Sequence, residues 1–102
     1  MSEYDMLFQS ISSAAEKVQE LQDLAVTHYR PAVERIIATR SRDVGEIESV
    51  LDGLLSFCGN ESALLLFRRL CRHYSEIDPA ATVDYINTYR EMWDSDVVEA
   101  EE

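Results

Sequence analysis

The sequence predicts an all-α fold in which a long, kinked first helix is followed by a three-helix hairpin array, packed as a bundle. Three observations predict it. Apolar residues recur at helical spacing along most of the chain, capping residues separate the periodic stretches, and 46% of the 102 residues are hydrophobic, which suits one core. A single domain is expected at this length. We place it at residues 1–93, followed by an acidic, flexible tail at residues 94–102 that carries five carboxylates.

The first predicted helix begins near residue 4 and carries a heptad stripe of apolar residues spaced alternately three and four apart. Pro31 disfavours the helical conformation at the residue before it and lacks an amide donor, so both a kink and a stop are compatible with the sequence. Helical spacing then resumes, and we expect a kinked or briefly broken continuation as far as Arg40. The stripe consists of Tyr4, Leu7, Ile11, Ala14, Val18, Leu21 and Ala25.

A capping box predicts the start of the second helix. Asp43 is followed three residues later by Glu46, so the Asp side chain accepts from early amides while the Glu side chain reaches back. The amphipathic run that follows extends to Cys58. Gly59 suits the left-handed position beyond a helix C-terminus, and we therefore expect the helix to end there.

Two further capping residues predict the last two helices. Asn60 is expected to cap a third helix that ends near Ile77 and has apolar residues over nearly half its circumference, so we expect it to be the most buried on that side. The short connection before it indicates an antiparallel hairpin with the second helix. Asp78 and Pro79 then predict the start of a fourth helix that ends near Trp93 and has a broad apolar side.

Arginine is unevenly distributed in this acidic chain. The net charge is −11, yet eight of the nine cations are arginine, and seven of those eight lie in residues 30–42 and 68–72. The first group also contains Arg30, and we interpret its other three members, Arg35, Arg40 and Arg42, as cations that complement the dipole at a helix C-terminus.

The second group predicts a contact surface. At 100° per residue these arginines lie together around an apolar centre on the side of the third helix that faces away from the core. Arginine binds carboxylates bidentately, and an exposed leucine among arginines resembles an interface anchor. Local pairing with Glu61 and Glu76 is the alternative interpretation. The candidate partner-binding residues are Leu65, Arg68, Arg69 and Arg72.

The length of the first helix predicts self-association. About 25 residues span about 37 Å, against about 22 Å for a 15-residue helix, so the later helices are too short to cover it. A second copy, packed as an antiparallel helix pair, would cover the remainder. A monomer whose fourth helix or tail covers the overhang is the alternative. We expect a homodimer whose interface contains Leu7, Ile11, Ala14, Val18 and Leu21.

The sequence contains no pattern typical of catalysis, of metal binding or of a cofactor. Cys58 and Cys71 are too few for a secreted disulfide framework, and we expect them to be reduced and buried. Neither His28 nor His73 belongs to a ligand constellation or pairs with a nucleophile. We therefore expect a protein that is not an enzyme and has no cofactor.

Charge and hydropathy also argue against membranes and nucleic acids as partners. No apolar run approaches the roughly 18 residues that span a bilayer, and the N-terminus lacks the pattern of an export signal. A net charge of −11 repels DNA, so direct nucleic-acid binding is not expected. We expect a cytoplasmic protein.

These exclusions favour a non-enzymatic, acidic helical module for protein–protein interaction, acting as a homodimer. A regulator, an inhibitor and a chaperone-like protein all belong to this class, and the sequence does not identify the partner. The alternative is a DNA-mimicking inhibitor of a nucleic-acid-binding enzyme, which would present an acidic surface. That surface would use the tail together with Asp5, Glu16, Glu20, Asp23, Glu46, Glu48 and Asp52.

Overall fold

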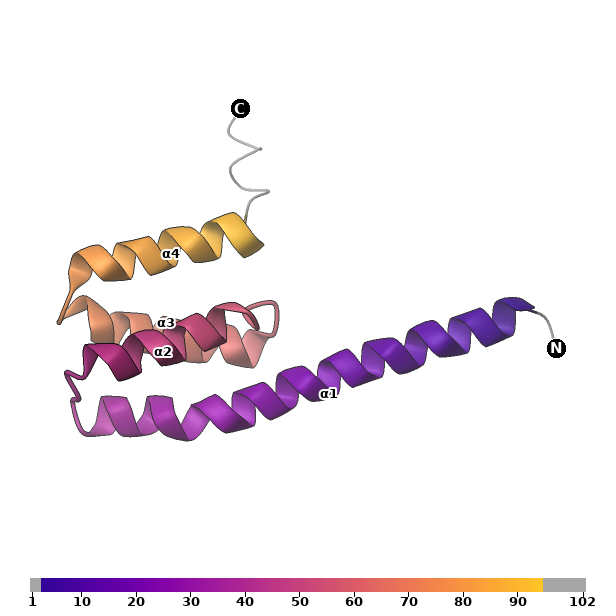
Figure 1. The fold of residues 1–102 in the computed structure, drawn as a ribbon, viewed down its shortest axis with the longest axis horizontal. Helices are drawn as coiled ribbons and strands as arrows, with labels where there is room; N and C mark the ends of the chain where they lie inside the picture. The colour runs from indigo at the N-terminus through magenta and orange to yellow at the C-terminus, as the bar shows by residue number, and fades with distance from the viewer. Residues whose placement is uncertain (1–2, 95–102) are drawn as a thin grey trace, which may run out of the picture.

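The computed structural model describes the backbone of residues 3–94 and the side chains of residues 14–94, and this part of the chain is all-α (Figure 1). Helix α1 spans Glu3–Ala38, α2 spans Val44–Leu55, α3 spans Glu61–Ser75 and α4 spans Pro79–Trp93. The predicted all-α, four-helix fold is confirmed. The predicted tail, apart from its first residue, lies outside the described residues. No helix in the described part combines the length and the apolarity needed to cross a bilayer.

Helix α1 continues through Pro31, and its axis changes direction between the half that packs on the other helices and the half that projects beyond them (Figure 1). The helix persists because the residues that follow the proline are held in the core: Val33 and Ile36 are fully buried. The last turn is closed by two hydrogen bonds, from the Arg40 amide to the Ile37 carbonyl and from the Ser41 amide to the Ile36 carbonyl. This is the pattern of a Schellman cap.

The left-handed backbone conformation predicted for Gly59 is found at Arg40 instead. Arg40 has a φ of 52°, whereas no glycine in the described part has a positive φ. The prediction for Gly59 was wrong because α2 ends at Leu55, with Ser56 as its C-cap. Gly59 instead makes room for the Trp93 ring, since a Cβ at this position would lie 3.0 Å from it.

The three predicted N-caps are present. Asp43 accepts a hydrogen bond from the Glu46 amide, Asn60 accepts from two amides at the start of α3, and Asp78 accepts from the Ala81 amide. The capping box is nevertheless incomplete. The Glu46 side chain accepts from Arg35 of α1, with N–O distances of 3.1 and 2.6 Å, and so links α1 to α2.

Helix α3 lies at the centre of the packing, as its broad apolar arc predicts. It packs against α1, α2 and α4, and it forms the expected antiparallel hairpin with α2 (Figure 1). Six of its residues are buried, against one in α4. The buried residues of α3 are Ala63, Leu66, Phe67, Leu70, Cys71 and Tyr74.

Helix α4 packs on α3 through aromatic side chains rather than through a broad apolar face. The Tyr89 ring lies 5.8 Å from the Phe67 ring, and the Trp93 indole N–H donates to the Leu55 carbonyl at 2.8 Å. The rest of its predicted apolar side is exposed, including Val83 and Ile86. One wall of the α3–α4 junction is therefore open to ligands or partners.

Two tyrosine hydroxyls join α3 and α4 to carboxylates of α2. Tyr74 donates to Glu48 at 2.5 Å, and Tyr85 donates to Asp52 at 2.8 Å. Burial, reinforced by the hydrogen bond to Glu48, raises the pKa of Tyr74 to about 12. Burial and the Asp52 carboxylate raise the pKa of Tyr85 well above its ordinary value. The packing thus stabilises both hydroxyls in their protonated form.

We predict that stability falls in alkali and that Tyr74 contributes to the fall. The unfolded chain releases this proton near pH 10 and the folded chain near pH 12, so the free energy of unfolding decreases as the pH rises between these values. Y74F lacks this titration and should show a shallower decrease. Urea denaturation between pH 8 and 12 measures both slopes, and equal slopes would contradict the prediction.

Two glycines of α2 should respond oppositely to alanine. A Cβ at Gly45 would make only an ordinary contact with the Asp43 carboxylate, at 3.6 Å, so G45A should stabilise the helix by about 0.5 to 1 kcal/mol. A Cβ at Gly53 would overlap the Tyr29 hydroxyl and ring, so G53A should destabilise the fold by about 1 kcal/mol. Chemical denaturation compares the variants. Equal effects would show that the Tyr29 ring moves away without cost.

Candidate functional site

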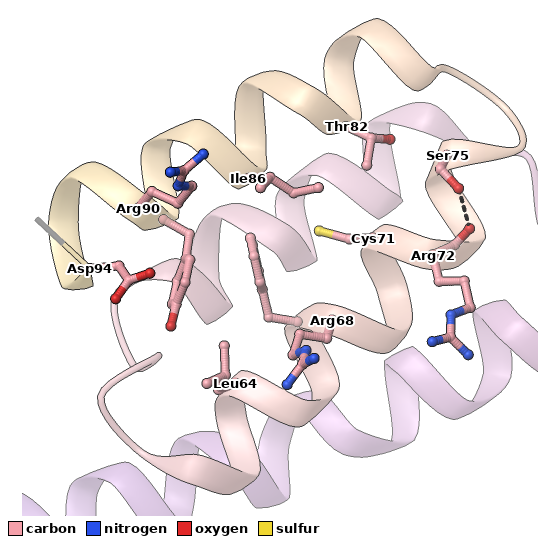
Figure 2. Close-up of a pocket in the computed structure, with 11 residues that line it drawn as sticks. Leu64, Arg68, Cys71, Arg72, Ser75, Thr82, Ile86, Arg90 and Asp94 are labelled. Atoms are coloured by element: carbon pink, nitrogen blue, oxygen red, sulfur yellow. Dashed lines mark hydrogen bonds between the residues drawn. The ribbon is translucent and has the colours of Figure 1, made fainter. Parts of the chain in front are cut away.

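A groove of about 570 Å³ lies between α3 and α4 and combines an apolar floor with arginine walls. Phe67 and Cys71 of α3 and Ile86 of α4 line its interior. Figure 2 shows Arg68 and Arg72 on the α3 side and Arg90 on the α4 side. The groove exists because α4 covers only one side of α3 with its aromatic residues and leaves the adjacent side open.

A second hollow, of about 650 Å³, lies between α3 and the C-terminal end of α1. Arg40 and Arg42 line it from the α1–α2 connection, and Arg69 and Arg72 line it from α3. Arg72 therefore belongs to both hollows. The two arginine-rich segments of the sequence meet here, and we call their joint surface, with the α4 arginine, the arginine face: Arg40, Arg42, Arg68, Arg69, Arg72 and Arg90.

A histidine fixes the position of the connection that carries two of these arginines. The Nε2 atom of His73, which is half-buried on α3, lies 2.7 Å from the Ser41 carbonyl oxygen. This contact, together with the Schellman cap at the end of α1, holds Arg40 and Arg42 beside α3. The position of Arg40 and Arg42 thus depends on hydrogen bonds to backbone groups.

Two of the arginines in these segments, Arg35 and Arg69, form salt bridges with carboxylates of neighbouring helices. Arg69 donates to both carboxylate oxygens of Glu34 on α1, at 2.8 and 3.4 Å, and these hydrogen bonds lower the pKa of Glu34. Arg35 holds Glu46 in the same way and lowers its pKa. Within residues 14–94 these are the two salt bridges, so no carboxylate in that range pairs with the other arginines of the face.

The predicted partner-binding residues do not form a single strip. Arg68 and Arg72 line the groove, Arg69 is tied to Glu34, and Leu65 is 59% exposed but lines neither hollow. The local pairs of Arg68 with Glu61 and of Arg72 with Glu76, which the spacing allows, are absent from the described residues. Within residues 14–94, Arg68 and Arg72 therefore have no salt-bridge partner, although Asp94 also lines the groove.

The predicted dimer residues lie on the half of α1 that projects from the other helices (Figure 1). Ala14, Val18 and Leu21 are exposed, the last two at 54% and 62%. The side chains of Leu7 and Ile11 lie outside the described residues. Within the described range, the stripe has no intramolecular cover.

Three arginines of the face, Arg40, Arg42 and Arg90, are not among the residues predicted to bind a partner. The contact of His73 with the α1–α2 connection is not predicted either. Helical spacing identifies which residues share one helix face, but not which faces of different helices meet. The clustering of arginine in residues 30–42 and 68–72 is visible in the sequence. That the two segments line one hollow follows only from the tertiary structure.

Within the described residues, this surface presents neither an ionised thiol nor a cluster of metal ligands. Cys58 and Cys71 are buried, as predicted, and burial raises their pKa values to about 11 and about 12, so both remain thiols near neutral pH. Among the described residues, no group of three or more His, Cys, Asp or Glu side chains is placed to hold a metal ion. The arrangement is suited to binding carboxylates and apolar side chains.

Comparison with known proteins found no match: no protein-family model, no curated protein and no solved structure is significantly similar to this chain.

Replacing His73 should loosen the α1–α2 connection. H73A removes the contact with the Ser41 carbonyl, so it should cost about 1 kcal/mol and speed amide exchange at residues 41–43. H28A is the matched control, because His28 is exposed on α1. Hydrogen exchange with mass spectrometry measures the effect, and protection that is unchanged in H73A would contradict this role.

Proposed function

We propose that this chain is a non-enzymatic protein–protein interaction module that binds an acidic, partly apolar segment of a partner protein on its arginine face. A regulator, an inhibitor and a chaperone-like protein would each use such a surface. The observation that carries the proposal is the α3–α4 groove, in which Arg68, Arg72 and Arg90 surround an apolar floor while no carboxylate of residues 14–94 pairs with them.

The chemistry of the two hollows favours a protein partner. Phe67 and Ile86 in the groove, and Ile37 and Ile77 in the second hollow, supply apolar surface that side chains of a peptide would cover. Arginine forks bind carboxylates bidentately, and arginine is enriched at interface hot spots. A partner segment with carboxylates beside apolar residues would use both features.

Charge argues against a nucleic acid as the ligand of this face. The chain carries 20 acidic and nine basic residues, so an extended polyanion is repelled at long range even where it meets arginine locally. A short acidic segment on a protein with its own basic residues avoids most of that repulsion. Binding should therefore weaken as salt screens the local attraction.

Three of the carboxylates that the DNA-mimic hypothesis requires are used in packing, whereas Glu16, Glu20 and Asp23 on α1 are exposed. Glu46 is held by Arg35, and Glu48 and Asp52 accept hydrogen bonds from buried or half-buried tyrosines. These three carboxylates are used in packing the helices. A mimic would need them to be free and evenly spaced on one surface.

Charge reversal on the arginine face should abolish partner capture. The tagged chain, R72E and R30E would each be used to capture proteins from lysate of the native host at low and moderate salt. Arg72 lines both hollows, whereas Arg30 is exposed on α1 away from them and changes the net charge equally. We expect R72E to lose at least about tenfold in recovery of the captured protein, while R30E retains it.

Two results would overturn the proposal. Equal recovery by wild type and R72E would show that the arginine face is not the contact surface. Capture of nucleic acid, or competition by added duplex DNA, would assign the face to a polyanion instead. Circular dichroism of R72E should match wild type, because this exposed side chain has no packing role.

A further inference from the structure

The N-terminal half of α1, residues 3–25, projects beyond the other three helices, and we call it the α1 arm (Figure 1). At 1.5 Å per residue it is about 35 Å long. Every side chain from Ala14 to Leu24 is exposed except Gln22, which is half-buried. Val18, Leu21 and Leu24 are 54%, 62% and 65% exposed. Burial of α1 side chains in the core begins at Val26.

Little within the described arm stabilises it as a solitary helix. Its one side-chain pair is a hydrogen bond from Gln19 to Asp23 at 3.3 Å, and neither salt bridge of residues 14–94 lies in it. Most helical stability in proteins comes from packing of an amphipathic face rather than from helix propensity. The exposed stripe therefore calls for a packing partner.

The charge pattern of the arm identifies the class of partner. Within residues 14–25 the positions that flank the stripe hold Ala15, Lys17, Gln22 and Leu24, so no carboxylate borders it. Glu16, Glu20 and Asp23 all lie more than about 120° from its centre at 100° per residue. Flanking charges normally select a partner in paired helices. Here their near absence allows a second helix that is equally acidic to approach.

We propose that the α1 arm packs against the α1 arm of a second copy of this chain as an antiparallel helix pair. The stripe alternates small and large residues, Ala14, Val18, Leu21 and Ala25, which permits close approach of two helices. Leu24 borders the contact and adds to the buried apolar surface. The pairing uses none of the residues of the arginine face. Its test is therefore independent of the test of the proposed function.

The antiparallel orientation follows from charge. Residues 26–94 of each chain carry a net charge of −3, which a parallel pair would place side by side. An antiparallel pair puts these two acidic parts at opposite ends of a contact about 35 Å long, well beyond the Debye length of about 8 Å at physiological salt. Helix dipoles also oppose each other favourably in this arrangement.

Sedimentation equilibrium of the full chain tests the pairing. From low to high micromolar concentration, wild type should approach twice its 11.7 kDa mass. L21E should raise the dissociation constant by at least about 100-fold, because each copy contributes one leucine to the contact. L65E is the matched control, since Leu65 is similarly exposed at 59% but lies on α3. It should remain a dimer.

Each other outcome overturns the proposal. A monomer at high micromolar concentration excludes self-association, and a dimer that survives L21E but is lost in L65E places the contact on α3. A dimer lost in R68E/R72E as well as in L21E would show that the arm docks in the α3–α4 groove of the second copy. Unchanged amide exchange in α3 of L21E would verify that the core stays folded and that the substitution acts on association.

Spin labels at S49C on α2 test the orientation in the same dimer. Ser49 is exposed, whereas the native cysteines Cys58 and Cys71 are buried and should not react. An antiparallel pair separates the two labels by more than the length of the arm. A short distance between them would show a parallel pair and overturn the antiparallel assignment.

Discussion

The fold depends on the burial of α3 against all three other helices. Ala63, Leu70 and Tyr74 are fully buried along its length, and its six buried residues lie on one side. The opposite arc carries Arg68, Arg69 and Arg72. Because α1 and α4 also pack on α3, each leaves a hollow beside that arc. The arginine face is therefore a consequence of how the core is assembled.

Ion pairing then determines what the arginine face can do. The chain has more than twice as many acidic as basic residues, so carboxylates are abundant. Nevertheless only Arg35 and Arg69 form salt bridges within residues 14–94, and both of those pairs link α1 to a neighbouring helix. Exposed pairs of this kind contribute little to stability but restrict side-chain geometry. Within residues 14–94, the other arginines of the face have no salt-bridge partner.

Helix α1 contributes to two separate surfaces, the arginine face near its C-terminal end and the apolar stripe of the α1 arm. Beyond Val26 it supplies core residues and, through Arg40 and the Schellman cap, part of the arginine face. Before Ala25 its apolar stripe has no cover in the described residues, and its carboxylates point away from that stripe. The two surfaces share one helix but no residues. The proposed partner contact and the proposed self-association therefore have no residue in common.

The sequence by itself determined the helices, because caps and apolar periodicity are local properties. Asp43, Asn60 and Asp78 cap the helices that they were predicted to cap. It did not determine where α2 ends, since the position of Gly59 reflects the Trp93 ring packed against it. Nor did it determine which arginines meet. That depends on how helices distant in sequence cross α3, and only tertiary packing decides those contacts.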